Sequence, residues 1–134
     1  DYSLISSETP LISNLNMLEN IALIKEFHEH LRTSQAQAIA KEYLQKLELA
    51  HIGKYRANQC TSLELFYVMV IRALMSQKKE ILIVTPLMLI KKIDTMNAII
   101  ETLEQFNNGE KNMTILDTLS NKLYYEGCRC NIIE

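Results

Sequence analysis

A short apolar segment in the second half of the chain constrains the fold more than any other feature. Residues 81–90 read ILIVTPLMLI, a β-branched run followed by a threonine, a proline and further apolar residues. Such a run is typical of a buried strand in a parallel sheet that ends at a functional edge. Many α/β enzymes carry an acid there, whereas this chain carries Val84 and Thr85. The segment is therefore either an active-site strand without its acids or an ordinary core strand.

Three capping-box patterns, each a side-chain acceptor followed three residues later by Glu or Gln, predict helix starts at Asn16, Ser34 and Thr61. The first helix is expected to carry an apolar face that extends to Phe27 and Leu31, and it forms a helical hairpin with the second. The third reads LELFYVMVIRALM, which is apolar almost all round and therefore predicts a buried helix. A fourth is expected over about residues 93–106, before an Asn-Asn-Gly stop.

Short strands are expected at residues 2–6, 113–118 and 130–134, in addition to the strand at residue 81. Strands that alternate with helices predict an α/β fold with a partial parallel sheet and covering helices. A length of 134 residues suits one domain. We expect a single domain over residues 1–134, with a helical subdomain at about 14–60 and the core strands and helices at 61–134.

Composition excludes several classes of function. The net charge of −2 gives no indication of nucleic-acid binding or of a polybasic membrane contact. The apolar runs are too short and too often broken by charge for a membrane span. Three cysteines do not look like a disulfide framework and favour a reducing compartment. With only three glycines and no GxxxxGK[ST] motif, the chain has no sequence for a phosphate-binding loop.

Candidate metal ligands are few, and we expect no cofactor. Cys128 and Cys130 lack the further ligands that a structural zinc site needs. His28 and His30 lie among glutamates without the i, i+4 spacing of a helical metal site, so a solvated polar face is the better interpretation. Asp117 ends a strand, and with no partner acid or base nearby it is interpreted as structural or as a helix cap.

Several segments, read together, resemble a known family. They are PLISNLNMLENIAL, NQCTSLELFYVMVIRALMSQKKEILIVTP, NMTILDTLS and CNIIE. In order and spacing they resemble the ATPase domain of ABC transporters from its middle to near its end, and Gln59, Arg72-Ala73-Leu74 and Pro86 align without gaps. The resemblance covers nearly the whole chain, although no single motif is intact. It implies a P-loop NTPase fold that lacks its N-terminal part.

By this resemblance, the residues that perform ATP hydrolysis are replaced. Val84 stands where the family keeps the magnesium-linked aspartate, and Thr85 where it keeps the catalytic glutamate. Ser7 stands at the Q-loop glutamine, Lys91 at the D-loop aspartate and Leu119 at the switch histidine. Phosphoryl transfer depends on positioning and charge stabilisation, and a threonine hydroxyl is a far weaker base than a carboxylate.

The signature motif, S-G-G-Q in the family, corresponds to Thr61, Ser62, Leu63 and Glu64. Without the two glycines the backbone cannot closely approach a phosphate. Glu64 stabilises the helix start and repels a phosphate there. The resemblance therefore implies a pseudo-ATPase with no nucleotide-binding residues.

Among the segments that resemble the family, the one after the Q-loop position is the most similar to it in residue type. In the family it belongs to the helical region that receives a cytoplasmic helix of the membrane permease. The residues expected to dock a partner are Pro10, Leu11, Leu15, Met17, Leu18 and Ile21.

These features imply a non-catalytic subunit or regulator that docks on a membrane permease subunit or a partner ABC ATPase. We expect it in the cytoplasm, on the inner face of the cell membrane, as a homo- or heterodimer. The sequence NLNMLENIAL is most similar to the branch of the ABC transporter family that moves lipids, lipoproteins or division proteins. Two alternatives stay open: a fragment of a divergent ATP-hydrolysing subunit whose P-loop lies outside this chain, and a duplicate kept only as a folded domain.

Overall fold

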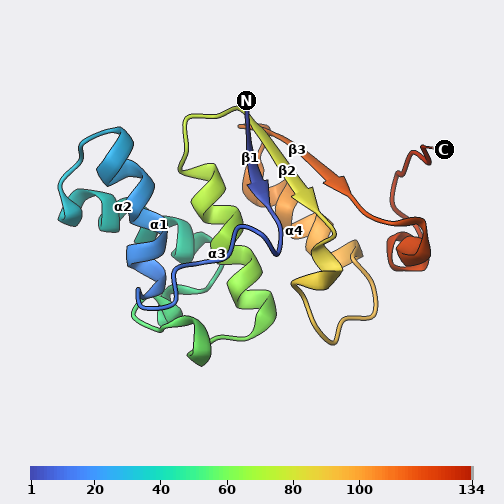
Figure 1. Ribbon diagram of the computed structural model, residues 1–134, viewed down its shortest axis with the longest axis horizontal. Coiled ribbons are helices and arrows are strands. Elements are labelled where there is room, and N and C mark those ends of the chain that lie inside the picture. The colour runs from blue at the N-terminus through green and yellow to red at the C-terminus, as the bar shows by residue number, and fades with distance from the viewer. Residues whose placement is uncertain (134) are drawn as a thin grey trace.

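A three-stranded parallel sheet forms the centre of the computed structural model, which describes residues 1–133 (Figure 1). The strands β1 (Tyr2–Ile5), β2 (Glu80–Val84) and β3 (Asn112–Leu116) lie in the order β1-β2-β3. The four α-helices are α1 (Met17–His28), α2 (Thr33–Lys46), α3 (Ser62–Leu74) and α4 (Asn97–Asn107). Short 3-10 helices occupy η1 (Ala50–Ile52), η2 (Ala57–Gln59), η3 (Pro86–Met88) and η4 (Leu119–Tyr125). The α/β class and the parallel sheet are as predicted.

One face of the sheet carries the main core. Successive side chains of a strand point to opposite faces, so Ile81 and Ile83 share one face of β2, and both are buried. In the register, Ile83 lies beside Ile5 of β1 and Ile115 of β3. Side chains from α3 and α4, including Phe66, complete this core, and Figure 1 shows α4 behind the sheet.

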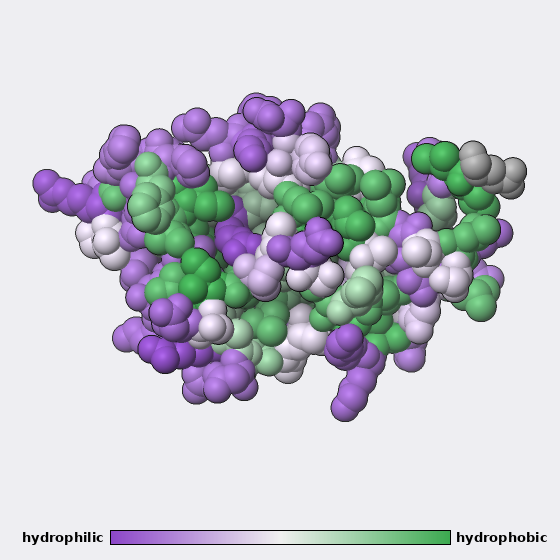
Figure 2. All heavy atoms as spheres, in the orientation of Figure 1, coloured by the Kyte–Doolittle hydropathy of each residue, from purple (hydrophilic) through white to green (hydrophobic). Residues whose placement is uncertain are grey.

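The opposite face, called here the open sheet face, is partly exposed and carries both apolar and polar side chains. The residues that point to it are Tyr2 and Leu4 of β1, Glu80, Leu82 and Val84 of β2, and Asn112, Thr114 and Leu116 of β3. Tyr2 and Leu116 are 53% and 45% exposed, and none of these side chains belongs to the core described above. Figure 2 shows hydrophobic atoms gathered where this face looks toward the viewer.

A second core joins the first three α-helices beside the sheet. Met17 and Ile21 of α1, Leu44 of α2 and Val68 and Ile71 of α3 are completely buried in it. In Figure 1, α1 and α2 lie on the far side of α3 from the sheet. The helix α3 contributes to both cores, which explains why its sequence is apolar almost all round.

Two of the three predicted capping boxes are present. Asn16 Oδ1 accepts from the Glu19 amide at 2.8 Å, and Glu19 Oε1 accepts from the Asn16 amide at 2.9 Å. The box at Ser34 is wrong, because α2 begins at Thr33 and Arg32 is its N-cap residue. The side chain that bonds back to the cap amide there is Gln35, at 3.3 Å.

Helix boundaries differ from the prediction at two further places. The first helix ends at His28, and His30 has a positive φ of 55° that turns the chain away. Phe27, in the last turn of the helix, is 70% exposed, and Leu31 lies outside the helix. The fourth begins at Asn97, later than expected, and stops as predicted, with Asn108 in the left-handed conformation.

The predicted strand at residues 130–134 is wrong as far as residue 133, and residue 134 lies outside the described residues. Residues 130–133 form no strand, and their side chains are exposed. A strand is stable only when a neighbour satisfies its backbone groups. The C-terminal segment extends beyond η4, away from β3, so it has no such neighbour in the described chain (Figure 1).

Candidate functional site

The carboxyl ends of the three parallel strands meet at one edge of the sheet, called here the carboxyl edge. This is where open α/β folds bind ligands. The positions predicted from the resemblance gather around it: Ser7 follows β1, Thr85 follows β2, and Leu119 follows β3. The start of α3 also lies there, because the Lys91 amide donates to Ser62 Oγ at 2.9 Å. The structure therefore brings the predicted signature position Ser62 next to Lys91.

Thr85 has an unusual backbone at the end of the central strand. Its φ and ψ are 44° and 60°, the left-handed region, which is unfavourable for a β-branched residue. Its amide donates to the Leu116 carbonyl at 2.7 Å, which ties the end of β2 to β3. Its hydroxyl lies 3.5 Å from Met88 Sδ. Val84 before it is half-buried and points to the open sheet face.

Asp117 is the acid that follows β3, and its oxygens are already engaged. Oδ1 accepts from the Thr118 amide at 2.7 Å and from Asn121 Nδ2 at 2.8 Å, and Oδ2 accepts from the Tyr125 hydroxyl at 2.6 Å. Burial, followed by this bond to Asp117, raises the pKa of Tyr125 above its ordinary value. Asp117 therefore holds η4 in place, because both of its carboxylate oxygens accept hydrogen bonds from neutral groups in this segment.

The start of α3 satisfies its own backbone. Thr61 Oγ1 accepts from the Glu64 amide at 3.1 Å, and Glu64 Oε1 accepts from the Thr61 amide at 2.8 Å. The other carboxylate oxygen of Glu64 lies 3.5 Å from His51 Nε2. A negative side chain thus occupies the helix end where an anion would bind, next to the half-buried Leu63.

The other predicted positions contribute little to a site. Ser7 is exposed in the turn after β1, and Leu119 is 65% exposed. Among residues 1–133, no three His, Cys, Asp or Glu side chains are close enough together to hold a metal ion.

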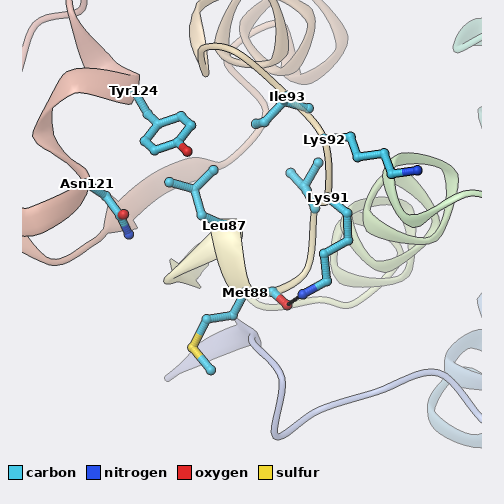
Figure 3. A pocket seen from close by; sticks show the side chains of 8 residues that line it. Leu87, Met88, Lys91, Lys92, Ile93, Asn121 and Tyr124 are labelled. Atoms are coloured by element: carbon cyan, nitrogen blue, oxygen red, sulfur yellow. Dashed lines mark hydrogen bonds between the residues drawn. The ribbon is translucent and has the colours of Figure 1, made fainter.

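A cavity of about 410 Å³ opens between the segment after β2 and η4. Figure 3 shows Leu87, Ile93 and Tyr124 facing one another across it. The Lys91 ammonium turns to the Met88 carbonyl, to which it donates at 3.3 Å, and the Lys92 side chain extends away (Figure 3). The cavity wall therefore combines apolar and polar side chains in similar measure, and neither lysine forms a phosphate cradle.

The predicted docking residues divide into two groups. Met17 and Ile21 are completely buried in the helical core, so their assignment to a partner-docking surface was wrong. The others remain accessible, to different degrees: Pro10 is exposed, and Leu11, Leu15 and Leu18 are half-buried. Residues 10–18, called here the docking segment, keep part of the predicted surface.

Two residues that the sequence analysis did not single out as site residues shape the docking segment. Asn20 is buried, and its side chain bonds both the amide and the carbonyl of Ile12, at 2.7 and 3.1 Å. Arg72 donates to the carbonyls of Thr9 and Pro10 at 2.6 and 3.1 Å, and burial lowers its pKa. The signal for Asn20 was present, because a polar residue at position 20 falls on the buried face of α1.

Comparison of this fold with solved structures shows what it is similar to. The dimeric, post-hydrolysis structure of the ATP-binding cassette MJ0796, bound to ADP and Pi, matches with a TM-score of 0.68. The fold of this chain resembles about half of an ATP-binding cassette. The match is 21% identical in sequence and covers 93% of this chain but 55% of the cassette, so the chain spans about half of that structure's length. No known protein family matches this chain, and no curated protein sequence does.

The described residues also contain no helix that is both long and apolar enough to cross a membrane.

Proposed function

We propose that this chain is a non-catalytic, ABC-ATPase-like subunit or regulator that docks on a membrane permease or on a partner ABC ATPase. The shared fold supports the general relationship. The chemistry at the carboxyl edge supports the absence of catalysis, and the accessible docking segment supports a role in assembly. Docking of this kind would hold the chain at the cytoplasmic face of the membrane, and the resemblance in the docking segment favours lipid or lipoprotein transport.

The observation that carries the proposal is the state of the acids at the carboxyl edge. The two positions after the central strand are Val84 and Thr85, which offer no carboxylate to support a magnesium ion or to activate water. Asp117, after the next strand, is held by three hydrogen-bond donors. Glu64 adds negative charge where a phosphate would approach α3. The residues at the end of β2, at the end of β3 and at the start of α3 therefore all disfavour ATP hydrolysis.

Calorimetry with Mg-ATP, combined with a phosphate-release assay, tests this proposal directly. We expect no binding at concentrations up to the millimolar range and no release of phosphate above the buffer blank. An intact ABC ATPase, measured in the same buffer, serves as the positive control. Micromolar affinity corresponds to about −8 kcal/mol and would contradict the proposal, because such affinity requires a formed phosphate site.

A second candidate is a piece of a divergent ATP-hydrolysing ABC subunit, whose P-loop lies outside this chain. The observation that favours it is the length of the match, which leaves nearly half of the cassette without a counterpart here. Co-expression with a neighbouring ATPase-like subunit separates the two candidates. Hydrolysis that is lost on Thr85→Ala would support the composite enzyme, whereas hydrolysis unaffected by this change would support the non-catalytic role.

A further inference from the structure

A second cavity, of about 290 Å³, opens between β1, α1 and α3, and it is called here the β1 cavity. Its wall is more apolar than polar, and the apolar part consists of Leu4, Ile24, Met69 and Ala73. The cavity also contains Lys78, which precedes the amino end of β2. The β1 cavity is therefore separate from the carboxyl edge.

Two cationic side chains line the β1 cavity, and neither is neutralised by an acid. Arg72 donates to the carbonyls of Thr9 and Pro10, at 2.6 and 3.1 Å, and Lys78 Nζ donates to the Tyr2 carbonyl at 3.3 Å. The described residues that line the cavity include no aspartate or glutamate. Neither cation forms an ion pair within residues 1–133. Both charges thus contact neutral carbonyl groups and no carboxylate of the described chain.

Neighbouring charges add to this positive character. Lys111 Nζ donates to the carbonyls of Ala73 and Lys78, at 3.4 and 2.6 Å, so a third cation bonds to two residues of the cavity wall. Glu80, at the start of β2, is held toward β3, because Asn112 Nδ2 donates to its carboxylate at 3.1 Å. The acid of the neighbouring strand therefore turns away from the β1 cavity.

Arg72 and Lys78 have hydrogen-bond donors left for a ligand. A guanidinium has five N–H donors and an ammonium has three. Within residues 1–133, Arg72 uses its donors for two carbonyls and Lys78 for one. Burial lowers the pKa of Arg72, which means that its charge has lost solvent without gaining a compensating anion. An anion in the β1 cavity would supply that compensation.

The volume and the wall of the cavity define the class of ligand. A cavity of about 290 Å³, at about 30 Å³ for each group of the size of a water molecule, holds about ten non-hydrogen atoms. An inorganic anion would leave the apolar wall uncovered, and a hydrocarbon would leave the cations without a partner. A ligand with an anionic head beside Arg72 and Lys78, and a short apolar body against Leu4, Ile24 and Met69, satisfies both parts.

We propose that the β1 cavity binds a small organic anion with an apolar body of about the size of octanoate. The proposal holds whether or not the chain hydrolyses ATP, because the cavity lies away from the carboxyl edge. Arg72 also holds the docking segment through the carbonyls of Thr9 and Pro10. The ligand therefore contacts the residue that joins α3 to that segment.

Two-dimensional proton–nitrogen NMR of the 134-residue chain, titrated with octanoate, tests the proposal. We expect saturable changes in chemical shift that give a dissociation constant of about 1 mM or tighter, largest at the amides of Ser3, Thr9 and Ala73. Octanol lacks the charge and acetate lacks the apolar chain. Each of these control ligands is therefore expected to bind at least about tenfold more weakly.

Two adjacent lysines provide matched protein variants. Lys78 and Lys79 are both exposed, and replacement by glutamine changes the charge equally, but only Lys78 lines the cavity. We expect Lys78→Gln to weaken octanoate binding about fivefold and Lys79→Gln to weaken it less than about twofold. The dispersion of the NMR spectrum shows that each variant is folded.

Four outcomes would overturn the proposal. The first is the absence of saturable shifts with octanoate, and the second is octanol or acetate binding as tightly as octanoate. The third is equal weakening by the two lysine substitutions, which would assign the binding to general charge attraction. The fourth is a set of shifts confined to the cavity that Leu87 and Tyr124 line.

Discussion

Asn20 shows how much one buried polar residue can organise. Its side chain makes four hydrogen bonds, with the Ile12 amide and with the carbonyls of Ile12, Leu15 and Asn16. The Ile12 and Asn16 carbonyls also accept from backbone amides, but Asn20→Ala leaves the Ile12 amide and the Leu15 carbonyl without this partner. We therefore expect a loss of about 2–3 kcal/mol in the free energy of unfolding, measured with urea. Asn14→Ala, an exposed neighbour, is expected to stay within about 0.5 kcal/mol of wild type. Equal effects would show that the bonds contribute little.

Tyr125 makes a pH-dependent contribution to stability. Its pKa is raised in the folded chain, mainly by burial and then by Asp117, so its contribution is full below about pH 10 and falls as the pH rises above the unfolded pKa. Tyr125→Phe costs about 1 kcal/mol at pH 7, because the bond to Asp117 is lost in a partly exposed place. Between pH 9 and 11, the variant should lose less stability than wild type. A parallel decline in both proteins would contradict this assignment.

At the scale of elements, the capping of α3 and α2 provides a matched comparison. Thr61 caps α3, so Thr61→Ala is expected to lower the free energy of unfolding by about 1 kcal/mol. Ser34 lies inside α2 and does not cap it, so Ser34→Ala is neutral or stabilises by up to about 0.5 kcal/mol. Thermal or urea unfolding measures both. A larger loss from Ser34→Ala would place the cap where the sequence pattern alone predicts it.

Local signals explain which elements were predictable. The boxes at Asn16 and Thr61 and the stop at Asn108 depend on residues a few positions apart, and the structure confirms all three. The box predicted at Ser34 is absent because the helix start lies two residues earlier, where the Gln35 side chain accepts from the Arg32 amide. The expected strand at residues 130–134 failed because pairing depends on a distant neighbour, which no local pattern reports.

In the candidate site too, features set by nearby residues were predictable and features set by distant residues were not. The order of strands and helices predicted a parallel sheet, and parallel strands end on the same side, which is why Thr85 and Leu119 lie at one edge. The left-handed backbone of Thr85 and the three bonds of Asp117 were not predictable, because they depend on Leu116 and Tyr125 being brought near by the fold. The burial of Met17 and Ile21 likewise depends on how α1 packs against α3.

For the whole molecule, the open sheet face predicts the behaviour of the isolated chain in solution. The dye anilinonaphthalene sulfonate binds exposed apolar surface, so we expect enhanced fluorescence with the folded wild-type chain. Leu82→Asp should reduce this enhancement, and Phe27→Asp should reduce it less, because Phe27 is a single side chain and not part of a continuous face. Circular dichroism confirms that each variant is folded. No fluorescence with the folded wild type would show that the face is closed in solution.

The pairing of β1 with β2 also has a consequence for synthesis on the ribosome. Tyr2 pairs with Glu80, so the pairing of β1 with β2 cannot form until the whole helical region between them has been made. At about 5–20 residues per second, the strand waits roughly 4–16 s. During that time α1 and α2, which contact each other, can already pack together. We therefore expect the helical region to form before β1 pairs with β2.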